Sequence, residues 1–196
     1  MRDRVGSIVA IVMLALITER ASAAYAAASA KTVNLRTSDL PAGFKQVTGK
    51  TVSNAQMAQQ THVPKAQFDR HGRIMGYQTE FDRNGTKGLV LVAANTYAYK
   101  SSSGAQWDYA GSLQHDLTQG GKRASAPRVG DASTGLVFVR KNGKQSITLY
   151  FIDFRRGRYD ATVGAAGLTG QVRMSDALHF ALIVDQRIQK GSSRLR

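Results

Sequence analysis

Five segments of the chain predict β-strands: residues 76–82 alternate weakly between apolar and polar side chains, and the two longest segments carry apolar side chains on both faces. These segments are residues 76–82, 88–99, 136–140, 145–155 and 158–164. Short turn sequences separate neighbouring segments, at Asn84-Gly85, Asn142-Gly143 and Arg156-Gly157. Because strands joined by tight turns run antiparallel, the pattern predicts an antiparallel sheet.

Three further segments predict helices. Ser53 and Gln56 have the spacing of a capping box, which opens a short helix that cannot continue through Pro64. Ser103 and Gln106 have the same spacing and open a second helix that extends to about Leu117. The expected buried stripe of this second helix is Trp107, Ala110, Leu113 and Leu117.

The third predicted helix lies near the C-terminus. Ser175 is its expected cap, and Asp176 complements the helix dipole in its first turn. Its buried stripe is Ala177, Phe180, Ala181, Val184 and Ile188. The segment between the last strand and this helix, residues 164–170, holds three glycines and is expected to be a loop.

The order of these elements predicts an α+β fold. One antiparallel sheet of about five or six strands would pack with three helices in a single domain over residues 38–190. Residues 24–37 are rich in alanine without periodicity, so they are expected to be a flexible lead-in, and residues 191–196 a basic tail.

The first residues resemble a secretory signal peptide. Arg2 and Arg4 precede an apolar run over residues 8–17, and Ala21-Ser22-Ala23 follows as a small-x-small cleavage site. A second such site ends at Ala30, so cleavage after Ala23 or after Ala30 is expected. The alternative is an uncleaved anchor, although the apolar run is about half of the twenty residues that span a bilayer. The mature protein is expected to be secreted or extracytoplasmic.

Composition narrows the chemistry. The 196 residues contain no cysteine, which excludes disulfides, thiolate metal sites and a cysteine nucleophile. Lysine and arginine number 27 against 13 acids, for a net charge of +14. The charge is spread evenly along the chain. It favours diffuse attraction to an anionic cell-wall polymer, a lipid surface or an extracellular polyanion. No specific nucleic-acid motif is present, and the oligomeric state stays open.

Catalytic and metal sites find little support in the sequence. None of His62, His71, His115 and His179 has the spacing of a zinc site. Asp153 interrupts an apolar strand on the same face as Arg155, so it is either that arginine's ion-pair partner or a general base. Asp153 and Asp160 flank a turn but are expected on opposite faces of the sheet. The sequence therefore predicts no catalytic residue, metal or cofactor.

Basic residues cluster at two predicted turns. Lys141 and Lys144 flank one turn, while Arg155, Arg156 and Arg158 lie at the other, and both groups are candidate anion contacts. The two turns end the same strand, so they lie roughly 33 Å apart and cannot form one compact site. The glycine-rich stretches 164–170 and 120–121 lack the spacing of a phosphate-binding loop and are expected to be turns.

Several short motifs together resemble a group of exported bacterial proteins. The motifs are residues 39–44 (DLPAGF), 72–77 (GRIMGY) with Phe81, 129–131 (VGD) and 154–157 (FRRG), followed by the alanine-rich C-terminal helix. In layout the group is similar to PsbP-like secreted domains and to extracellular sensor domains. The resemblance implies helices packed on an antiparallel sheet and implies no catalytic residue.

These observations favour a secreted, non-enzymatic binding or sensor-like domain. Its ligand pocket is expected between the sheet and the helices, near Tyr97, Tyr99 and Trp107. The alternative is a secreted hydrolase in which the fold brings a histidine to Asp153. A cleft with converging acids and a histidine would favour the hydrolase.

Overall fold

A seven-stranded antiparallel sheet, in the order β1-β2-β3-β7-β6-β5-β4, forms the centre of the protein. The computed structural model describes residues 30–84, 87–142 and 145–193. The strands are β1 (Lys45–Val52), β2 (Arg73–Asp82), β3 (Leu89–Tyr99), β4 (Lys122–Ala124), β5 (Ala132–Asn142), β6 (Gln145–Arg156) and β7 (Tyr159–Leu168). β3 and β7 pair at the centre, which joins the N-terminal strands to the C-terminal ones.

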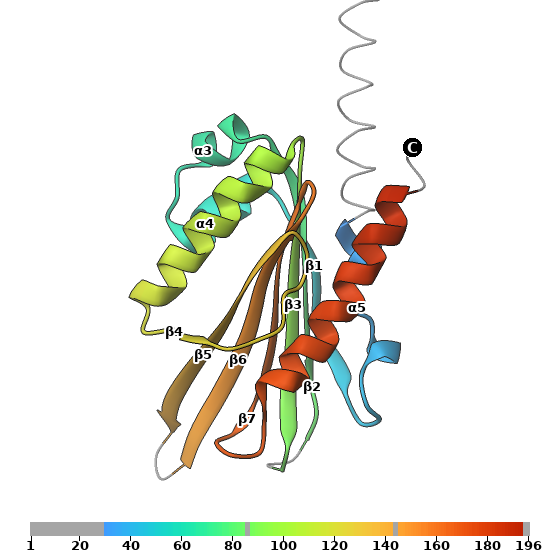
Figure 1. Ribbon diagram of the computed structural model, residues 1–196, viewed down its shortest axis with the longest axis vertical. Helices are drawn as coiled ribbons and strands as arrows, with labels where there is room; N and C mark the ends of the chain where they lie inside the picture. Colours follow the sequence, from blue (N-terminus) through green and yellow to red (C-terminus); the bar gives the residue numbers. More distant parts are fainter. Residues whose placement is uncertain (1–29, 85–86, 143–144, 194–196) are drawn as a thin grey trace, which may run out of the picture.

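Helices cover both faces of the sheet (Figure 1). One face carries α2 (Asn54–Thr61), α3 (Lys65–Arg70) and α4 (Ser102–Thr118), and the other carries α5 (Met174–Ser193). A short 3-10 helix, η1 (Thr37–Asp39), precedes β1. The described residues thus form an α+β domain, as predicted, but with seven strands and five helical elements where five or six strands and three helices were expected.

The main apolar core lies between α5 and the sheet. Alternate residues of the central strands, such as Val92, Phe154 and Val163, meet the helix. The predicted stripe of α5 is fully buried there: Ala177, Phe180, Ala181, Val184 and Ile188. Burial of this apolar surface is the dominant favourable contribution to folding on this face.

β1 and β4 are the strands that the alternation pattern missed. Both lie at edges of the sheet, and seven of the eight residues of β1 are exposed or partly exposed, from Lys45 to Thr51. An edge strand with water on both sides needs no apolar face, so it leaves no period-two pattern in the sequence. β4 has three residues and pairs with β5, with Lys122 opposite Val137. It is too short to show a period-two pattern.

Capping agrees with the prediction at one helix and differs at two. Ser53 and Gln56 form the expected capping box of α2. Ser101, not Ser103, caps α4, because its hydroxyl accepts from the Gly104 N–H. At α5 the Asp176 carboxylate accepts from the Arg173 N–H, so Ser175 lies inside the helix and is not its cap.

Two predicted loops are ordered parts of the fold. Residues 164–168 continue β7, and only the following residues turn, with Gly170 at a positive φ of 86°. Residues 30–37, expected in a flexible lead-in, pack into the domain. The Asn34 side chain is buried there and donates to the carbonyls of Tyr77 and Ala94 on β2 and β3. These two hydrogen bonds fix the segment to the sheet.

Several sequence-based predictions lie outside the described residues. They are the signal peptide over residues 1–23, residues 24–29 of the lead-in, the turn glycines Gly85 and Gly143, Lys144, and residues 194–196 of the tail. Among the described residues, none of the helices combines the length and the apolar character that crossing a membrane requires.

Candidate functional site

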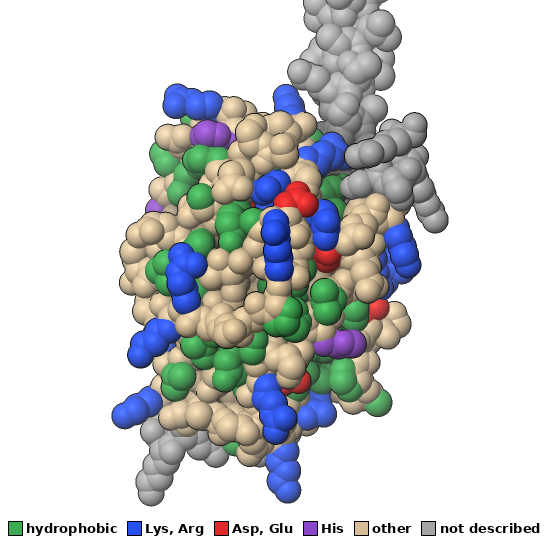
Figure 2. All heavy atoms as spheres, in the orientation of Figure 1, with side chains coloured by type: hydrophobic (Ala, Val, Ile, Leu, Met, Phe, Trp, Pro, Cys, Tyr) green, Lys and Arg blue, Asp and Glu red, His purple; other side chains and the backbone are tan. Residues whose placement is uncertain are grey.

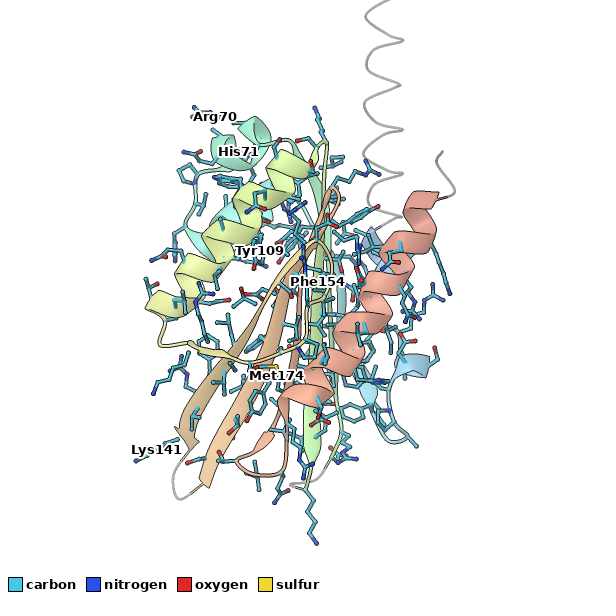
Figure 3. All side chains as sticks on the ribbon, in the orientation of Figure 1. Arg70, His71, Tyr109, Lys141, Phe154 and Met174 are labelled. Carbon is cyan, nitrogen blue, oxygen red and sulfur yellow. The ribbon has the colours of Figure 1, made fainter. Side chains whose placement is uncertain are left out.

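The side of α4 that faces the sheet carries polar side chains as well as the buried Ala105 and Tyr109. Asp108, Ser112 and Asp116 follow one another at four-residue spacing and are buried or partly buried. The predicted apolar stripe is wrong at Ala110, which is exposed, while Trp107, Leu113 and Leu117 are half-buried. The helix therefore directs two carboxyl groups toward the strands beneath it. Tyr109 also reaches from α4 to the sheet, where its hydroxyl lies 2.8 Å from the Thr134 hydroxyl of β5 (Figure 3).

Two further acids point from the sheet toward α4. Strand pairing sets Asp153 of β6 beside Thr162 of β7, and Thr162 beside Asn95 of β3. Asp160 lies two residues before Thr162, so it shares this face. The expectation that Asp153 and Asp160 lie on opposite faces is wrong, because the turn between β6 and β7 brings the two residues to one side. Asp108, Asp116, Asp153 and Asp160 are called the acid cluster below.

A cleft of about 350 Å³ opens between α4 and the sheet, over part of the acid cluster. Ser112, His115 and Asp116 of α4 form one wall, and residues of β3, β5, β6 and β7 form the other. The complete lining is Met57, Asn95, Tyr97, Ser112, His115, Asp116, Phe138, Arg140, Leu149, Phe151 and Thr162. This α4 cleft combines aromatic walls with hydroxyl, amide, imidazole and carboxyl groups, as small-molecule sites do.

Asp153 lies just behind the inner end of the α4 cleft, and it is not itself one of the lining residues. Its neighbours in the sheet, Thr162 and Phe151, and Asp116 opposite all line the cleft. The side chain is 1% exposed, and neither carboxylate oxygen forms a hydrogen bond of ordinary geometry within the described chain. Burial, with the nearby Asp116 charge, raises the pKa of Asp153 to about 7.

The rest of the acid cluster shares one buried cation. Burial raises the pKa of Asp108 and of Asp160, and Arg73 opposes this shift at both carboxyls. The Tyr99 hydroxyl donates to Asp108, while Oδ2 of Asp160 has no hydrogen-bond partner among the described residues. Burial also raises the pKa of Asp116. The charge of Arg73 thus acts at the Asp108 and Asp160 end of the cluster.

Arg73 is itself buried and held by several groups. Its Nη1 donates to the Asn54 side chain at 2.7 Å and to the Val52 carbonyl at 3.2 Å. Its guanidinium carbon lies 4.8 Å from the ring centre of Tyr97 and 5.7 Å from that of Phe68. Two of its nitrogens, Nε and Nη2, have no hydrogen-bond partner in the described chain. The cation is therefore fixed in place by aromatic rings and by β1 and α2.

The three predicted pocket residues separate into different environments. Tyr97 lines the α4 cleft. Trp107 lines an adjoining apolar pocket of about 130 Å³, which shares Met57, Ser112 and His115 with the cleft. Tyr99 lines neither, because it is wholly buried against Asp108. The predicted location between sheet and helices thus coincides with two adjoining pockets, and Tyr99 belongs to the floor beneath them.

The predicted anion contacts do not come together. Arg155 pairs with Asp131 at 3.2 Å and with Gln106, and Arg156 pairs with Asp185 at 2.7 Å. The expected ion pair between Arg155 and Asp153 is therefore absent among these contacts. Arg158 lies over the Tyr159 ring. Lys141 is exposed, at the end of the sheet opposite to His71 and Arg70 (Figure 3). Lysine and arginine side chains are scattered over the visible surface (Figure 2).

The histidines have different roles. His115 lines both pockets beside Asp116, whereas His71 stacks on Trp107 with ring centres 4.1 Å apart. His62 ends α2 with a φ of 59°, and His179 contacts Phe180. No hydrogen bond joins His115 to Asp116 or Asp153 in the described chain. Across residues 30–84, 87–142 and 145–193, no three acidic or histidine side chains gather as metal ligands.

Comparison with known proteins supports the fold. No protein-family model matches the chain, and no curated protein matches it in sequence. The fold is similar to that of the extracellular domain of PknH from Mycobacterium tuberculosis. The two share 12% sequence identity, with a TM-score of 0.52 over 84% of this chain and 97% of that domain. This agrees with the predicted likeness to an extracellular domain at the level of fold, while the likeness to PsbP-like domains stays a prediction.

Sequence reasoning singled out Asp153 as a possible general base and Tyr97 as a pocket residue, but it did not assemble the rest of the site. Asp108 was missed because the helix was expected to have an apolar inner face through Trp107 and Ala110. The spacing of Asp108, Ser112 and Asp116 was the available signal, since three polar residues four apart define one helical face. Asn95 and Thr162 carry no sequence signal, because only the β3–β7 pairing brings them together.

Proposed function

We propose that this protein is an extracytoplasmic, non-enzymatic binding domain that takes a small ligand into the α4 cleft. The observation that carries the proposal is the inner end of that cleft, where the Asp153 carboxyl is buried with no hydrogen bond of ordinary geometry and with only Thr162 and Asp116 as longer polar partners in the described chain. Buried polar groups in folded proteins are nearly always satisfied, so exceptions concentrate at sites of function. A ligand in the cleft would supply the missing partner.

Two further observations agree with a place outside the cytoplasm. The basic start, apolar run and small-x-small sites of residues 1–30 have the layout of an export signal. The fold resembles that of an extracellular domain. Fusion of residues 1–30 to a reporter that is active only after export, with mass spectrometry of the released chain, tests this part. Cleavage after Ala23 or Ala30 is the expected result.

A hydrolase is the second candidate, because His115, Asp116 and Asp153 all lie at one cleft. Binding is favoured over hydrolysis because no hydrogen bond connects His115 to either acid in the described chain. A general base and its orienting acid are normally within such reach, although catalytic contacts are sometimes longer without substrate. Ester, peptide and glycoside substrates tested with the protein and with Asp153→Asn separate the two functions. Turnover that this variant abolishes would favour the hydrolase.

A small-molecule screen by NMR on the purified protein tests the binding function. Ligands are expected to shift the amide signals of Asn95 and Thr162, which lie on the cleft floor. Ser112→Phe would fill the cleft and should abolish the shifts. Ala110→Phe adds the same ring to the exposed side of α4 and should leave them unchanged. Ligands that bind both variants equally would contradict the proposal.

Diffuse affinity for anionic polymers is a separate proposal about the surface. It is supported by the net charge of +14 and by the dispersed lysine and arginine side chains. Such attraction depends on screened, long-range electrostatics and involves no particular cleft residue.

A further inference from the structure

We propose that the α4 cleft selects a small organic ligand with one ammonium group, which Asp153 and Asp116 bind at the inner end. This inference rests on the proposed binding function and specifies the chemistry of its ligand. It is argued from the placement of charges around the cleft, the aromatic walls and the position of Arg140.

Counter-charges are distributed unevenly across the acid cluster. Arg73 lies beside Asp108 and Asp160, and Tyr99 donates a hydrogen bond to Asp108. Asp153 lacks such help: neither of its oxygens forms a hydrogen bond of ordinary geometry, and the Thr162 and Asp116 side chains act on it only as longer partners. No Lys or Arg of the described chain forms an ion pair with Asp153 or with Asp116. The inner end of the cleft therefore holds two carboxyl groups without a lysine or arginine partner, and His115 is the basic side chain that acts on Asp116.

A buried carboxylate needs a counter-charge or hydrogen-bond donors. Removing a carboxylate from water costs several kcal/mol, which an adjacent cation with donors offsets. An ammonium group supplies one positive charge and three N–H donors in a volume that fits between two carboxyls. A metal ion matches less well, because no three acidic or histidine side chains of the described residues are arranged so that they could hold one.

The cleft walls fit an ammonium group that carries a short carbon chain. Phe138 and Phe151 line the cleft with ring centres 5.6 Å apart in an edge-to-face arrangement. Aromatic faces attract organic cations, and their rings bury the attached carbon atoms. Thr162 lies beside Asp153 in the sheet and Asn95 lies beyond Thr162, and both offer oxygen acceptors for the remaining N–H groups.

Arg140 limits the number of positive charges that the ligand can carry. It lines the same cleft, donates to the Gln119 carbonyl and lies over Phe138. On β5 it is six residues from Thr134, which pairs with Asp153, so its backbone lies about 20 Å from the acid row along the strand. A ligand long enough to carry a second cation out of the cleft would approach Arg140, so a single ammonium group is preferred.

Three probes of nearly equal size test the charge of the ligand: butylamine, butanol and butyrate. Their affinities are measured by NMR titration of the Asn95 and Thr162 amides at about pH 8, where Asp153 is largely ionised. Butylamine should shift both signals at millimolar concentration, as expected for a probe with few atoms. Butanol and butyrate should produce smaller shifts or none.

Variants of the acids test the assignment. Asp153→Asn and Asp116→Asn should each weaken butylamine binding by about tenfold or more, the value of a hydrogen bond to a charged group. Asp176→Asn removes the same charge from α5 on the other face of the sheet and keeps an oxygen that can cap the helix, so it should bind as the unaltered protein does. Circular dichroism confirms that each variant is folded.

The outcomes separate this inference from the proposed function. If butanol or butyrate binds as well as butylamine with the same shifts, the ammonium inference is wrong and the cleft remains a binding site. If calcium or magnesium salts alone produce the shifts, the ligand is a metal ion and the inference is also wrong. Unchanged butylamine affinity in both acid variants would overturn it directly. If neither the probes nor the screen shift cleft signals, both proposals fail.

Discussion

The two faces of the central strands differ in chemistry, although successive residues of the same strands point alternately to one face and to the other. Toward α5, β6 and β7 present Ile152, Phe154 and Val163, which are fully buried among apolar neighbours. Toward α4, the same strands present Asp153 and Asp160, which are buried to the same degree. The first face stabilises the domain, whereas the second carries groups whose burial opposes stability.

This difference indicates where function lies. A fold that needs only stability would place apolar side chains on both faces of a covered sheet. The α4 face instead retains a cleft, unpaired carboxylate oxygens and a buried arginine. Local destabilisation of this kind is characteristic of binding and catalytic sites.

The largest expected effect is the loss of stability when a core side chain on the α5 face is truncated. Phe180→Ala removes a side chain that is 2% exposed at the centre of the core and should lower the free energy of unfolding by about 3–5 kcal/mol. Phe151→Ala is the matched change on the α4 face, where the ring is half-buried along the cleft, and should cost less. Urea denaturation measures both. Equal losses would mean that the two faces contribute alike.

A second prediction concerns Asp153 and the dependence of stability on pH. The pKa of this group rises from 3.8 to about 7 on folding, so the folded state binds more protons between these values. Stability should therefore fall as the pH rises from about 4 to about 7, and remain lower above that range. Asp153→Asn should reduce this fall and stabilise the protein at about pH 8 by about 1–3 kcal/mol.

The control for this prediction is again Asp176→Asn, measured by urea denaturation at about pH 5 and about pH 8. Asp108, Asp116 and Asp160 face the same interior, and burial raises the pKa of each, so part of the fall should remain in Asp153→Asn. A variant that is less stable than the unaltered protein at about pH 8 would show that the Asp153 carboxylate is satisfied by partners.

The smallest expected effect concerns charge on the outer surface, which the two faces share. Retention on heparin should weaken as salt rises, because exposed charges are screened beyond about 8–10 Å. Lys141→Ala with Lys144→Ala should lose a modest share of the retention, similar to that lost by Arg155→Ala with Arg158→Ala. Complete loss with one pair and no loss with the other would indicate a localised anion site in place of diffuse attraction.

The sequence predicted the α5 face well because its signal is local. Ala177, Phe180 and Val184 repeat at helical spacing, so the helix reveals its buried side without its partners. The capping box of Ser53 and Gln56 is equally local and is confirmed. The same reasoning failed for β1, whose edge position depends on the whole sheet.

The α4 face required knowledge of the pairing between distant strands. Asp160 and Asp153 share a face because Arg156 pairs with Tyr159, which fixes the register of the two strands. Asn95 reaches the site only because β3 pairs with β7. Polar residues that face a cleft also leave no apolar pattern in the sequence. A search for core positions, which looks for that pattern, therefore does not detect them.

The strand order has a kinetic consequence. β3 is complete long before β7 leaves the ribosome, since the chain emerges from its N-terminus. Until β7 arrives, β3 presents an unpaired edge, which can pair with another chain and aggregate. Contacts between distant parts of the chain also close the domain, as Arg187 meets Asn34 across 153 residues. A fold that depends on pairing between distant parts of the chain is expected to form slowly. The α4 cleft and the acid cluster form only when this pairing is complete.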